Sequence, residues 1–419
     1  MKIKNKQITL IIVCWLLYTC SYIGKYGYSA NLNPIMAYYG VEKGTAGLAG
    51  SLFFFAYGAG QIINGICCKY YNKKYVIFGA TLVAGAVNLI IFLDFLPFAY
   101  IKYLWLINGM AQSVFWPTLI LTLGENLSGE NMKKSILAMA STVACGTTIV
   151  YAASALFVKI LNFKYAFLLG AVSLFVAGLV WVFLYNGMTE KRPVEASAPQ
   201  ENAGEVKPEK TEKKGVRLDK VFLITLISMA IFCAIDNLVK DGFNTWVPTI
   251  LKERFRLGDS LSISLTIVLP IVGMFGTALT LFLNRFIKDY MMLTGVIFGM
   301  AFVVLGGIVL LFGTNLWVLI LVLFGLSSLL MHGANGVLTS IAPLYMRDKI
   351  NPGLLSGLMN GSCYVGSTIS SYCLGALAEA SGWNAVLIML TGSCLFPVIV
   401  CGIFFITKKI VANKKSLNS

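Results

Sequence analysis

The sequence is poor in charged residues. Only 12% of its 419 residues are Asp, Glu, Lys or Arg, about half the share that is usual in soluble globular proteins. Hydrophobic residues make up 58% of the chain, and the mean hydropathy is +0.79. A chain of this composition has too little charge to cover a water-facing surface, so a soluble globular domain is excluded.

Groups that support chemistry are also scarce. The chain has one histidine, and its ten cysteines all fall within or at the edges of apolar blocks. They show neither a metal-ligand spacing nor the arrangement of a disulfide framework. No nucleophile stands beside a base in the pattern of a catalytic site. We therefore predict no enzyme activity, no cofactor and no metal.

What the sequence has instead is a series of long apolar blocks. There are twelve, many of them reaching the roughly 20 residues that a helix needs to cross a bilayer. They cover 8–38, 46–67, 75–96, 98–124, 134–158, 164–186, 219–251, 261–284, 289–313, 315–344, 352–378 and 382–407. The blocks are continuously apolar, without the alternation of a membrane β-barrel. The prediction is an all-α membrane protein with twelve transmembrane helices.

The formal net charge of +15 is unevenly distributed between the loops. If the amino terminus is cytoplasmic, most Lys and Arg residues fall in cytoplasmic segments, and few, such as Lys43, Lys102 and Arg254, fall outside. This bias is the positive-inside pattern. It predicts a protein of the cell membrane with both termini in the cytoplasm, and it accounts for the positive charge without nucleic acid.

A polar segment divides the blocks into two sets of six. Residues 189–217 are rich in Lys, Glu and Pro and contain hardly any large apolar side chain, so we expect a disordered cytoplasmic linker. The prediction is an N-terminal six-helix bundle at 1–188 and a C-terminal six-helix bundle with a short cytoplasmic tail at 218–419. Two equal halves favour a pseudo-two-fold relation between the bundles.

The first helix of each half carries the same short pattern. Lys25 is followed by a glycine two residues later and by Pro34, and Lys240 is followed by a glycine two residues later and by Pro248. A charge in the middle of a span costs about 2.5–3.5 kcal/mol on insertion scales and usually serves a function. Transporters with paired halves bind substrate at the interface near mid-membrane. The repeat therefore predicts that Lys25 and Lys240 form a cationic clamp for an anion.

Two structural alternatives remain open at this stage. Asp236, four residues before Lys240, and the adjacent Asp241 place acids where an intrahelical ion pair would neutralise that lysine. Lys25 has the alternatives of reaching to the outer surface or pairing with another helix. However, polar residues at helical spacing occur on six helices, as the walls of a wet cavity would require. They are Tyr18, Tyr22, Lys25 and Ser29; Asn237, Lys240 and Asn244; Tyr57, Gln61 and Asn64; Asn108 and Gln112; Ser328, His332, Asn335 and Thr339; and Asn360, Tyr364, Ser367 and Ser371.

Several segments resemble the organophosphate:phosphate antiporter family of the major facilitator superfamily, which holds the glycerol-3-phosphate and hexose-phosphate transporters. They are Tyr22-Ile-Gly-Lys25-Tyr-Gly-Tyr-Ser29 with Pro34, Asp241–Thr249, Phe115-Trp116-Pro117 and Asn360–Trp383. The resemblance implies the major facilitator fold. It also implies that Lys25 and Lys240 take the places of the family's two phosphate-binding arginines. The site would be lined by Tyr18, Tyr22, Tyr57 and Tyr364, and Asn237 is a further binding candidate from the polar stripe.

The segment Gly65–Lys74 resembles the superfamily's loop motif G-x-x-x-D-R-x-G-R-R. Lys69 stands where the motif has its Asp, so the acid that usually contacts a neighbouring helix is missing. Glu125, at the inner end of the fourth block, is expected to be a surface charge.

The sequence supports three functions. The first is a secondary carrier that exchanges a small organic anion, such as a sugar phosphate or glycerol phosphate, for inorganic phosphate by alternating access. The second is proton-coupled symport of a carboxylate or other organic anion, with Asp236 or Asp241 as the coupling group. The third is a membrane sensor of the same fold that transports nothing. The expected partners are the small anion, phosphate or a proton, and the lipid bilayer, and we expect a monomer.

Overall fold

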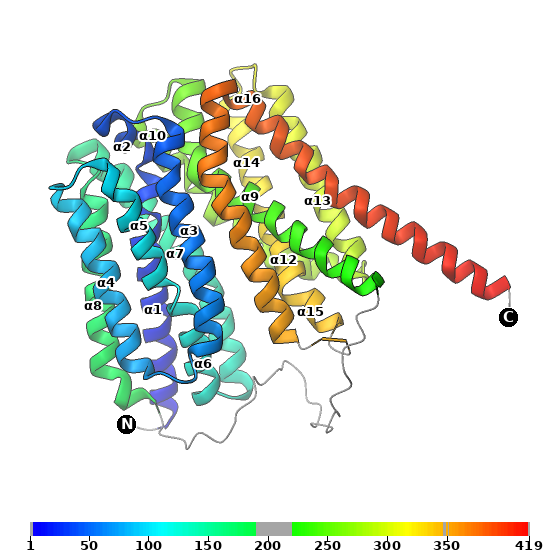
Figure 1. Ribbon diagram of the computed structural model, residues 1–419, viewed down its shortest axis with the longest axis horizontal. Helices are drawn as coiled ribbons and strands as arrows, with labels where there is room; N and C mark the ends of the chain where they lie inside the picture. The colour runs from blue at the N-terminus through cyan, green and yellow to red at the C-terminus, as the bar shows by residue number, and fades with distance from the viewer. Residues whose placement is uncertain (1–2, 190–219, 347–348, 351, 418–419) are drawn as a thin grey trace. The chain divides into compact units, whose positions relative to one another are not determined.

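The computed structural model describes residues 3–189, 220–346, 349–350 and 352–417. Within these ranges the chain is helical and has no strand (Figure 1). The predicted linker lies outside the described residues except for Thr189. Eleven helical segments of the described chain are long and apolar enough to cross a membrane, and one of them, Leu354–Thr407, has 54 residues. Because this segment is more than twice the length of one span and bends at Gly382, it accounts for two spans, which confirms the prediction of twelve.

Eight helices form the first six spans. They are α1 (Ile3–Ala30), α2 (Leu32–Tyr39), α3 (Lys43–Cys67), α4 (Lys73–Leu93), α5 (Phe98–Gln112), α6 (Phe115–Asn126), α7 (Gly129–Ile160) and α8 (Tyr165–Met188). Two predicted spans are interrupted, between α1 and α2 and between α5 and α6. At the first break, Asn31 Nδ2 donates to the carbonyl of Gly27 and to Ser154 Oγ, both at 2.8 Å. A side chain that enters the backbone hydrogen-bond pattern is a usual cause of a helix kink.

The remaining six spans follow the linker. They are built from α9 (Lys220–Phe255), α10 (Asp259–Thr266), α11 (Val268–Gly273), α12 (Gly276–Leu283), α13 (Tyr290–Leu311), α14 (Trp317–Gly336), the π-helical turn η1 (Val337–Ile341), α15 (Ala342–Tyr345) and α16 (Pro352–Leu417). The predicted span 261–284 consists of three short helices, with Pro270 inside the second. In α16 two helices meet at Gly382, whose φ of 77° is a conformation that glycine adopts without steric cost.

The helices form two compact units. The first comprises Met1–Gly40 and Leu48–Arg217, and the second comprises Val41–Gly47 and Leu218–Ser419. In the first unit, α1 packs against α7 and α8, and α4 packs against α8. In the second unit, α9 packs against α16, and α13 packs against α14 and α16. The helices that carry the two lysines, α1 and α9, are therefore each held by several neighbours within their own unit.

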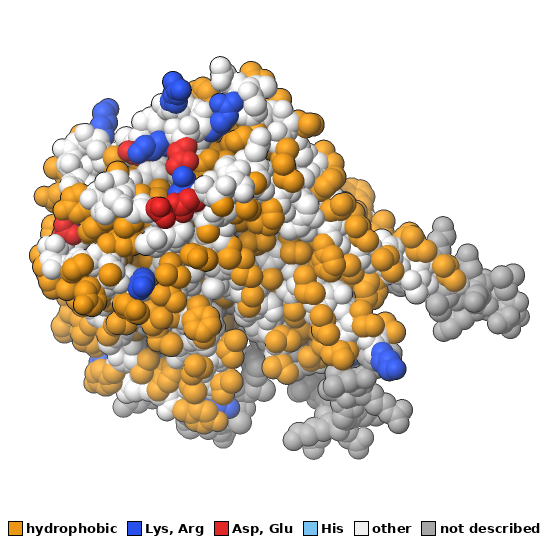
Figure 2. All heavy atoms as spheres, turned by 45° about the horizontal axis from the view of Figure 1, so that its top comes forward, with side chains coloured by type: hydrophobic (Ala, Val, Ile, Leu, Met, Phe, Trp, Pro, Cys, Tyr) orange, Lys and Arg blue, Asp and Glu red, His pale blue; other side chains and the backbone are white. Residues whose placement is uncertain are grey.

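The lateral surfaces of the spans are apolar. Large hydrophobic side chains that are more than half exposed include Phe55, Phe183, Val303 and Leu310. Figure 2 shows hydrophobic side chains covering much of the visible surface, with charged side chains gathered over one end. Such a surface is unstable in water and stable in lipid. The chain is thus a polytopic integral membrane protein.

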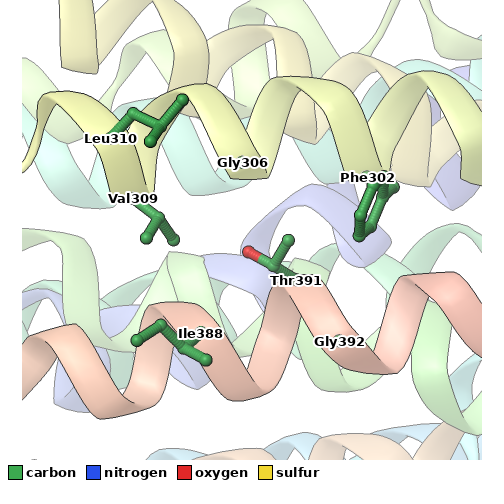
Figure 3. Close-up of a pocket in the computed structure, with 7 residues that line it drawn as sticks. All are labelled: Phe302, Gly306, Val309, Leu310, Ile388, Thr391 and Gly392. Carbon is green, nitrogen blue, oxygen red and sulfur yellow. The ribbon is translucent and has the colours of Figure 1, made fainter.

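A groove of about 430 Å³ opens between α13 and the second part of α16 (Figure 3). It is lined by Phe302, Gly306, Val309, Leu310, Ile388, Thr391 and Gly392. The hydroxyl of Thr391 donates a hydrogen bond to the carbonyl of Leu387, one turn earlier in the same helix. The lining of the groove is therefore apolar, and it offers no charged group that could bind an anion.

The loop motif Gly65–Lys74 contacts α6 through an ion pair of Lys73, the first residue of α4. Lys73 Nζ lies 2.7 Å from Glu125 Oε1, and the hydroxyls of Tyr71 and Thr118 lie 2.9 Å apart. The side chain of Glu125 is 34% exposed, so it is a surface charge as predicted, but it is paired with a lysine. With Lys69 in place of the motif's acid, the loop motif supplies the base of this charge contact and α6 supplies the acid.

A second ionic cluster joins α2 to the segments that follow α4 and precede α8. Asp94 accepts hydrogen bonds from Lys164 Nζ at 2.5 Å, from the Tyr38 hydroxyl at 2.7 Å and from the Tyr39 hydroxyl. Burial favours the neutral acid, but these hydrogen bonds and the charge of Lys164 outweigh it. They hold the pKa of Asp94 below its ordinary value of 3.8.

Asp94→Asn should lower the free energy of unfolding by about 1–3 kcal/mol, the usual range for hydrogen bonds to charged groups. Because folding lowers the pKa of Asp94, this stabilisation is complete above pH 3.8 and is lost as the pH falls through the folded-state value. Thermal unfolding of both proteins in detergent at a series of pH values measures the difference. Glu130→Gln is the control, because it breaks a pair with Lys134 that is exposed. Equal losses of stability in the two variants would show that Asp94 contributes no more to stability than an exposed ion pair does.

Candidate functional site

Lys25 lies in α1, and only 7% of its surface is exposed. Five aromatic rings surround its ammonium group, and we call these five residues the ring cage. The ring centroids lie 4.5 Å from Nζ for Tyr57, 5.2 Å for Phe54, 5.3 Å for Tyr22 and Tyr26, and 5.5 Å for Phe53. The faces of aromatic rings attract a cation, by about 2 kcal/mol or more where water is excluded. The ring cage therefore stabilises a charge within the span, and Lys25 does not reach to the membrane surface.

The ring cage is assembled from two helices of the first unit. Tyr22 and Tyr26 flank the lysine on α1, whereas Phe53, Phe54 and Tyr57 come from little more than one turn of α3. The sequence pattern named Tyr22 and Tyr57 and missed the other three. A phenylalanine in an apolar block carries no signal for a contact with a cation, because the same residue type faces lipid or core elsewhere.

Tyr18 extends this cluster by one turn toward the start of α1. Its hydroxyl lies 3.4 Å from that of Tyr57, and its ring centroid lies 5.2 Å from that of Tyr22 and 5.0 Å from that of Trp116. The predicted residues Tyr18, Tyr22, Lys25 and Tyr57 are thus brought together in the first unit. Two hydroxyls beside a buried cation are groups that can donate to the oxygens of a phosphate or carboxylate.

The backbone beside Lys25 is held from two further helices. Asn88 in α4 and Asn108 in α5 each donate an amide hydrogen bond to the carbonyl of Gly24 at 3.2 Å, and both side chains are fully buried. Gln112 Nε2 in turn donates to Asn108 Oδ1 at 3.0 Å. Asn108 and Gln112, predicted as part of a cavity wall, therefore have a structural role. They fix α1 at the point from which the lysine projects.

Lys240 in the second unit has different surroundings. Its Nζ lies 3.9 Å from Asp236 Oδ2, and Asp236 is completely buried. The same carboxylate oxygen accepts a hydrogen bond from Asn335 Nδ2 in α14 at 3.1 Å. The intrahelical pair that the sequence left open is therefore present. Its separation is longer than the 2.5 and 2.7 Å of the two ion pairs described above.

Asp241 belongs to a group of three hydrogen-bonded side chains. It accepts a hydrogen bond from Ser367 Oγ in α16 at 2.5 Å and one from Asn237 Nδ2 at 3.4 Å, and Asn237 also donates to Ser367 Oγ at 2.9 Å. The predicted residues of α9 thus meet in one polar cluster. We call it the acid–lysine network, and it consists of Asp236, Asn237, Lys240, Asp241, Asn335 and Ser367.

The remaining polar candidates of the second unit lie on α14 and α16. Tyr364 is half-buried three residues before Ser367, and its carbonyl accepts a hydrogen bond from Thr368 Oγ1. His332 Nδ1 lies 2.9 Å from the carbonyl oxygen of Ser328, so the histidine takes part in the hydrogen bonding of its own helix. Among the described residues, no group of three His, Cys, Asp or Glu is placed to hold a metal ion.

The crossing of α9 and α16 depends on the glycine next to Ser367. A Cβ atom on Gly366 would lie 1.9 Å from the carbonyl oxygen of Ala234 and 2.9 Å from the backbone nitrogen of Leu238. Small residues let transmembrane helices approach this closely. The contact brings Ser367 within hydrogen-bond distance of Asp241.

The architecture defines the class of protein. Twelve spans, with ionisable side chains buried in the first span of each half, are typical of a secondary transporter. The chain belongs to the Major Facilitator Superfamily, whose family model matches residues 14–348. It is therefore a membrane transporter and not an enzyme.

Two relatives carry the same name. Sugar phosphate exchanger 3 of Homo sapiens is 24% identical over 412 residues, which cover 87% of this chain and 82% of the relative. Sugar phosphate exchanger 3 of Bos taurus is 22% identical over 416 residues, which cover 88% of this chain and 81% of the relative. The similarity agrees with the resemblance to the organophosphate:phosphate antiporters that the motifs indicated.

Solved structures share the fold. A bacterial homolog of the human lysosomal transporter Spinster, in an inward-facing and occupied conformation, has a TM-score of 0.72 at 14% identity. The match covers 95% of this chain and 96% of that one. A D-xylose-proton symporter has a TM-score of 0.70 at 9% identity, with coverage of 94% and 96%. At such identities the likeness establishes the major facilitator fold alone.

Gly366→Ala should destabilise the protein by about 1–3 kcal/mol, as overpacking of a close contact does. Gly357→Ala is the matched control on the same helix, because a Cβ atom there would meet nothing within 4 Å. Thermal unfolding in detergent should show a loss for Gly366→Ala and no loss for Gly357→Ala. Equal stability of the two variants would show that the crossing of α9 and α16 tolerates a wider separation.

Proposed function

We propose that this transporter exchanges a phosphorylated organic anion, such as a sugar phosphate or glycerol phosphate, for inorganic phosphate by alternating access. The observation that carries the proposal is the ammonium group of Lys25 buried in the ring cage. A positive charge kept inside a span at this cost is expected to serve an anion. The name of the relatives, sugar phosphate exchanger 3, supports a phosphorylated cargo.

Lys25 has the central role in this proposal. Its ammonium group binds an oxygen of the phosphoryl group, and the hydroxyls of Tyr18 and Tyr57 donate to the others. Lysine offers a compact charge with three rotatable donors, in place of the flat fork of an arginine. The aromatic rings hold this charge in position without supplying a negative charge that would compete with phosphate. Lys240 is the matching cation of the C-terminal half, with Tyr22, Tyr364 and Asn237 as further binding residues.

The exchange follows from the cost of moving an empty carrier. Cations in low-dielectric surroundings cost several kcal/mol each unless they are neutralised. An anion from either side of the membrane neutralises the positive charge that the protein's own groups leave uncompensated, and the carrier then reorients. Organic phosphate moving in one direction and inorganic phosphate moving in the other can both neutralise the carrier. Net movement of one without the other is therefore slow.

The topology of the carrier is part of the proposal. Positive residues favour cytoplasmic termini in the cell membrane. The two six-helix bundles at 1–188 and 218–419 are then joined on the cytoplasmic side by the linker at 189–217. One chain with two such halves is sufficient for alternating access, so the proposed working form is the monomer.

Lys25→Ala should abolish uptake of labelled phosphate into liposomes loaded with phosphate, because the variant loses the charge that neutralises the anion. Lys25→Arg keeps the charge and should retain measurable exchange. Lys69→Ala is the matched control, because the Lys69 ammonium also lies near a ring, 4.8 Å from the centroid of Tyr70, but on the exposed surface. Uptake should remain unchanged in that variant. Normal uptake by Lys25→Ala, or none by the wild-type protein, would refute the proposal.

A further inference from the structure

Asp236 is a buried acid with one unsatisfied oxygen. Its Oδ2 faces Lys240 and Asn335, whereas its Oδ1 has no hydrogen-bond partner among the described residues. No part of the residue is exposed. Nearly all buried polar atoms in proteins are hydrogen-bonded, and a charged oxygen without a partner is costly. A neutral carboxylic acid lowers that cost because the charge is gone.

The neighbouring acid, Asp241, has the hydrogen-bond donors that Oδ1 of Asp236 lacks in the described part of the chain. Asp241 accepts hydrogen bonds from Ser367 at 2.5 Å and from Asn237 at 3.4 Å. Hydrogen bonds from neutral donors favour the ionised form of a carboxylate. The two acids that flank Lys240 therefore differ in their hydrogen bonding, and Asp236 is the one with a buried oxygen that no donor reaches among the described residues.

The balance of charge also favours a proton on Asp236. With both acids ionised, the acid–lysine network holds two negative charges and one positive charge. A proton on Asp236 makes the network neutral. An uncompensated buried charge is strongly unfavourable. An anion arriving at Lys240 would add to the excess of negative charge unless a proton arrived as well.

We propose that Asp236 is a proton-binding site of the carrier and takes up a proton when an anion binds at Lys240. The proton comes from water and is placed on Oδ1, while Oδ2 keeps its hydrogen bond from Asn335. An ionised Asp236 repels the anion and competes with it for Lys240, and the neutral acid does neither. Each ligand therefore strengthens the binding of the other, and anion affinity rises as the pH falls. This inference rests on the proposed function in placing the anion at Lys240.

Other titratable groups also lie near Asp236. Besides Lys240 and Asp241, those in the described residues are Cys233 on α9, His332 on α14, and Cys363 and Cys394 on α16. A proton on His332 would also favour an anion, so the experiment must recognise the titrating group by a signal that only a carboxyl gives.

Infrared difference spectroscopy gives that signal through the carbonyl stretch of a neutral carboxylic acid. Adding inorganic phosphate at neutral pH should increase this band in the wild-type protein and leave it unchanged in Asp236→Asn. Asp236→Glu retains a carboxyl and should show the band at a shifted frequency. Asp259→Asn is the matched control, because it breaks an Asp–Lys pair of 2.9 Å with Lys252 outside the network. It should behave as wild type.

The pH dependence of phosphate affinity, measured by calorimetry, is a second readout. Asp236→Asn mimics the neutral acid and should keep its affinity as the pH rises. Wild-type affinity should fall relative to that of the variant, by up to about tenfold per pH unit, the limit for one linked proton. The ionisation of phosphate itself acts on both proteins and cancels in the ratio.

Two results would overturn the proton site. One is a phosphate-induced carboxyl band that persists unchanged in Asp236→Asn, and the other is an affinity ratio that stays constant with pH. Either result leaves the proposed exchange intact if labelled phosphate still enters phosphate-loaded liposomes. If phosphate does not bind to the wild-type protein, the proposed function fails. A pH titration of the carboxyl band without phosphate then decides whether Asp236 binds a proton.

Discussion

A charge inside a membrane must be stabilised by the protein itself, and the organisation of both units depends on this requirement. Transfer of an ion from water to low-dielectric surroundings costs several kcal/mol even after the surroundings relax. The chain carries a lysine in the first span of each half and stabilises the two in different ways. Lys25 is surrounded by rings that attract its ammonium group but carry no net charge. Lys240 lies beside an acid, within a network that contains a second one.

Both arrangements require helices that are held firmly against one another. In the first unit the firmness comes from amide hydrogen bonds, because Asn88 and Asn108 both bind the carbonyl of Gly24 beside the lysine. In the second unit the close contact of the helices depends on a glycine. The backbone of α9 approaches Gly366 so closely that a Cβ atom would not fit. Lipid supplies no hydrophobic force between helices, so close packing and polar contacts of these two kinds hold a membrane protein together. The same contacts that stabilise each bundle thus also position its buried charge.

The sequence was sufficient for the parts of this structure that depend on local pattern. Apolar blocks predict the twelve spans because each block must cover the bilayer by itself. The i, i+4 spacing of Asp236 and Lys240 made their pairing one of the open alternatives, and the structure decides for it. The break before Phe115 was not predicted, because it is a small local change inside an apolar block. The break at Asn31 was not predicted, because it involves a side-chain contact with Ser154 on another helix. Phe53 and Phe54 were missed for the same reason, since their partner is a lysine on a different helix. The ion pair of Glu125 was missed because Lys73, which binds it, is distant in sequence.

The repeat in the sequence therefore does not produce two equivalent lysines. Rings stabilise the ammonium of Lys25 through their quadrupoles and carry no net charge. The carboxylates around Lys240 carry charge of the opposite sign, and their oxygens are unequally satisfied. Asp241 accepts from Ser367 and Asp236 accepts from Asn335, but the second oxygen of Asp236 has no hydrogen-bond partner among the described residues. The first unit thus surrounds its lysine with uncharged rings, and the second places its lysine among acids. In the proposed exchange the two cations therefore would not act alike, although they occupy matching places in the repeat.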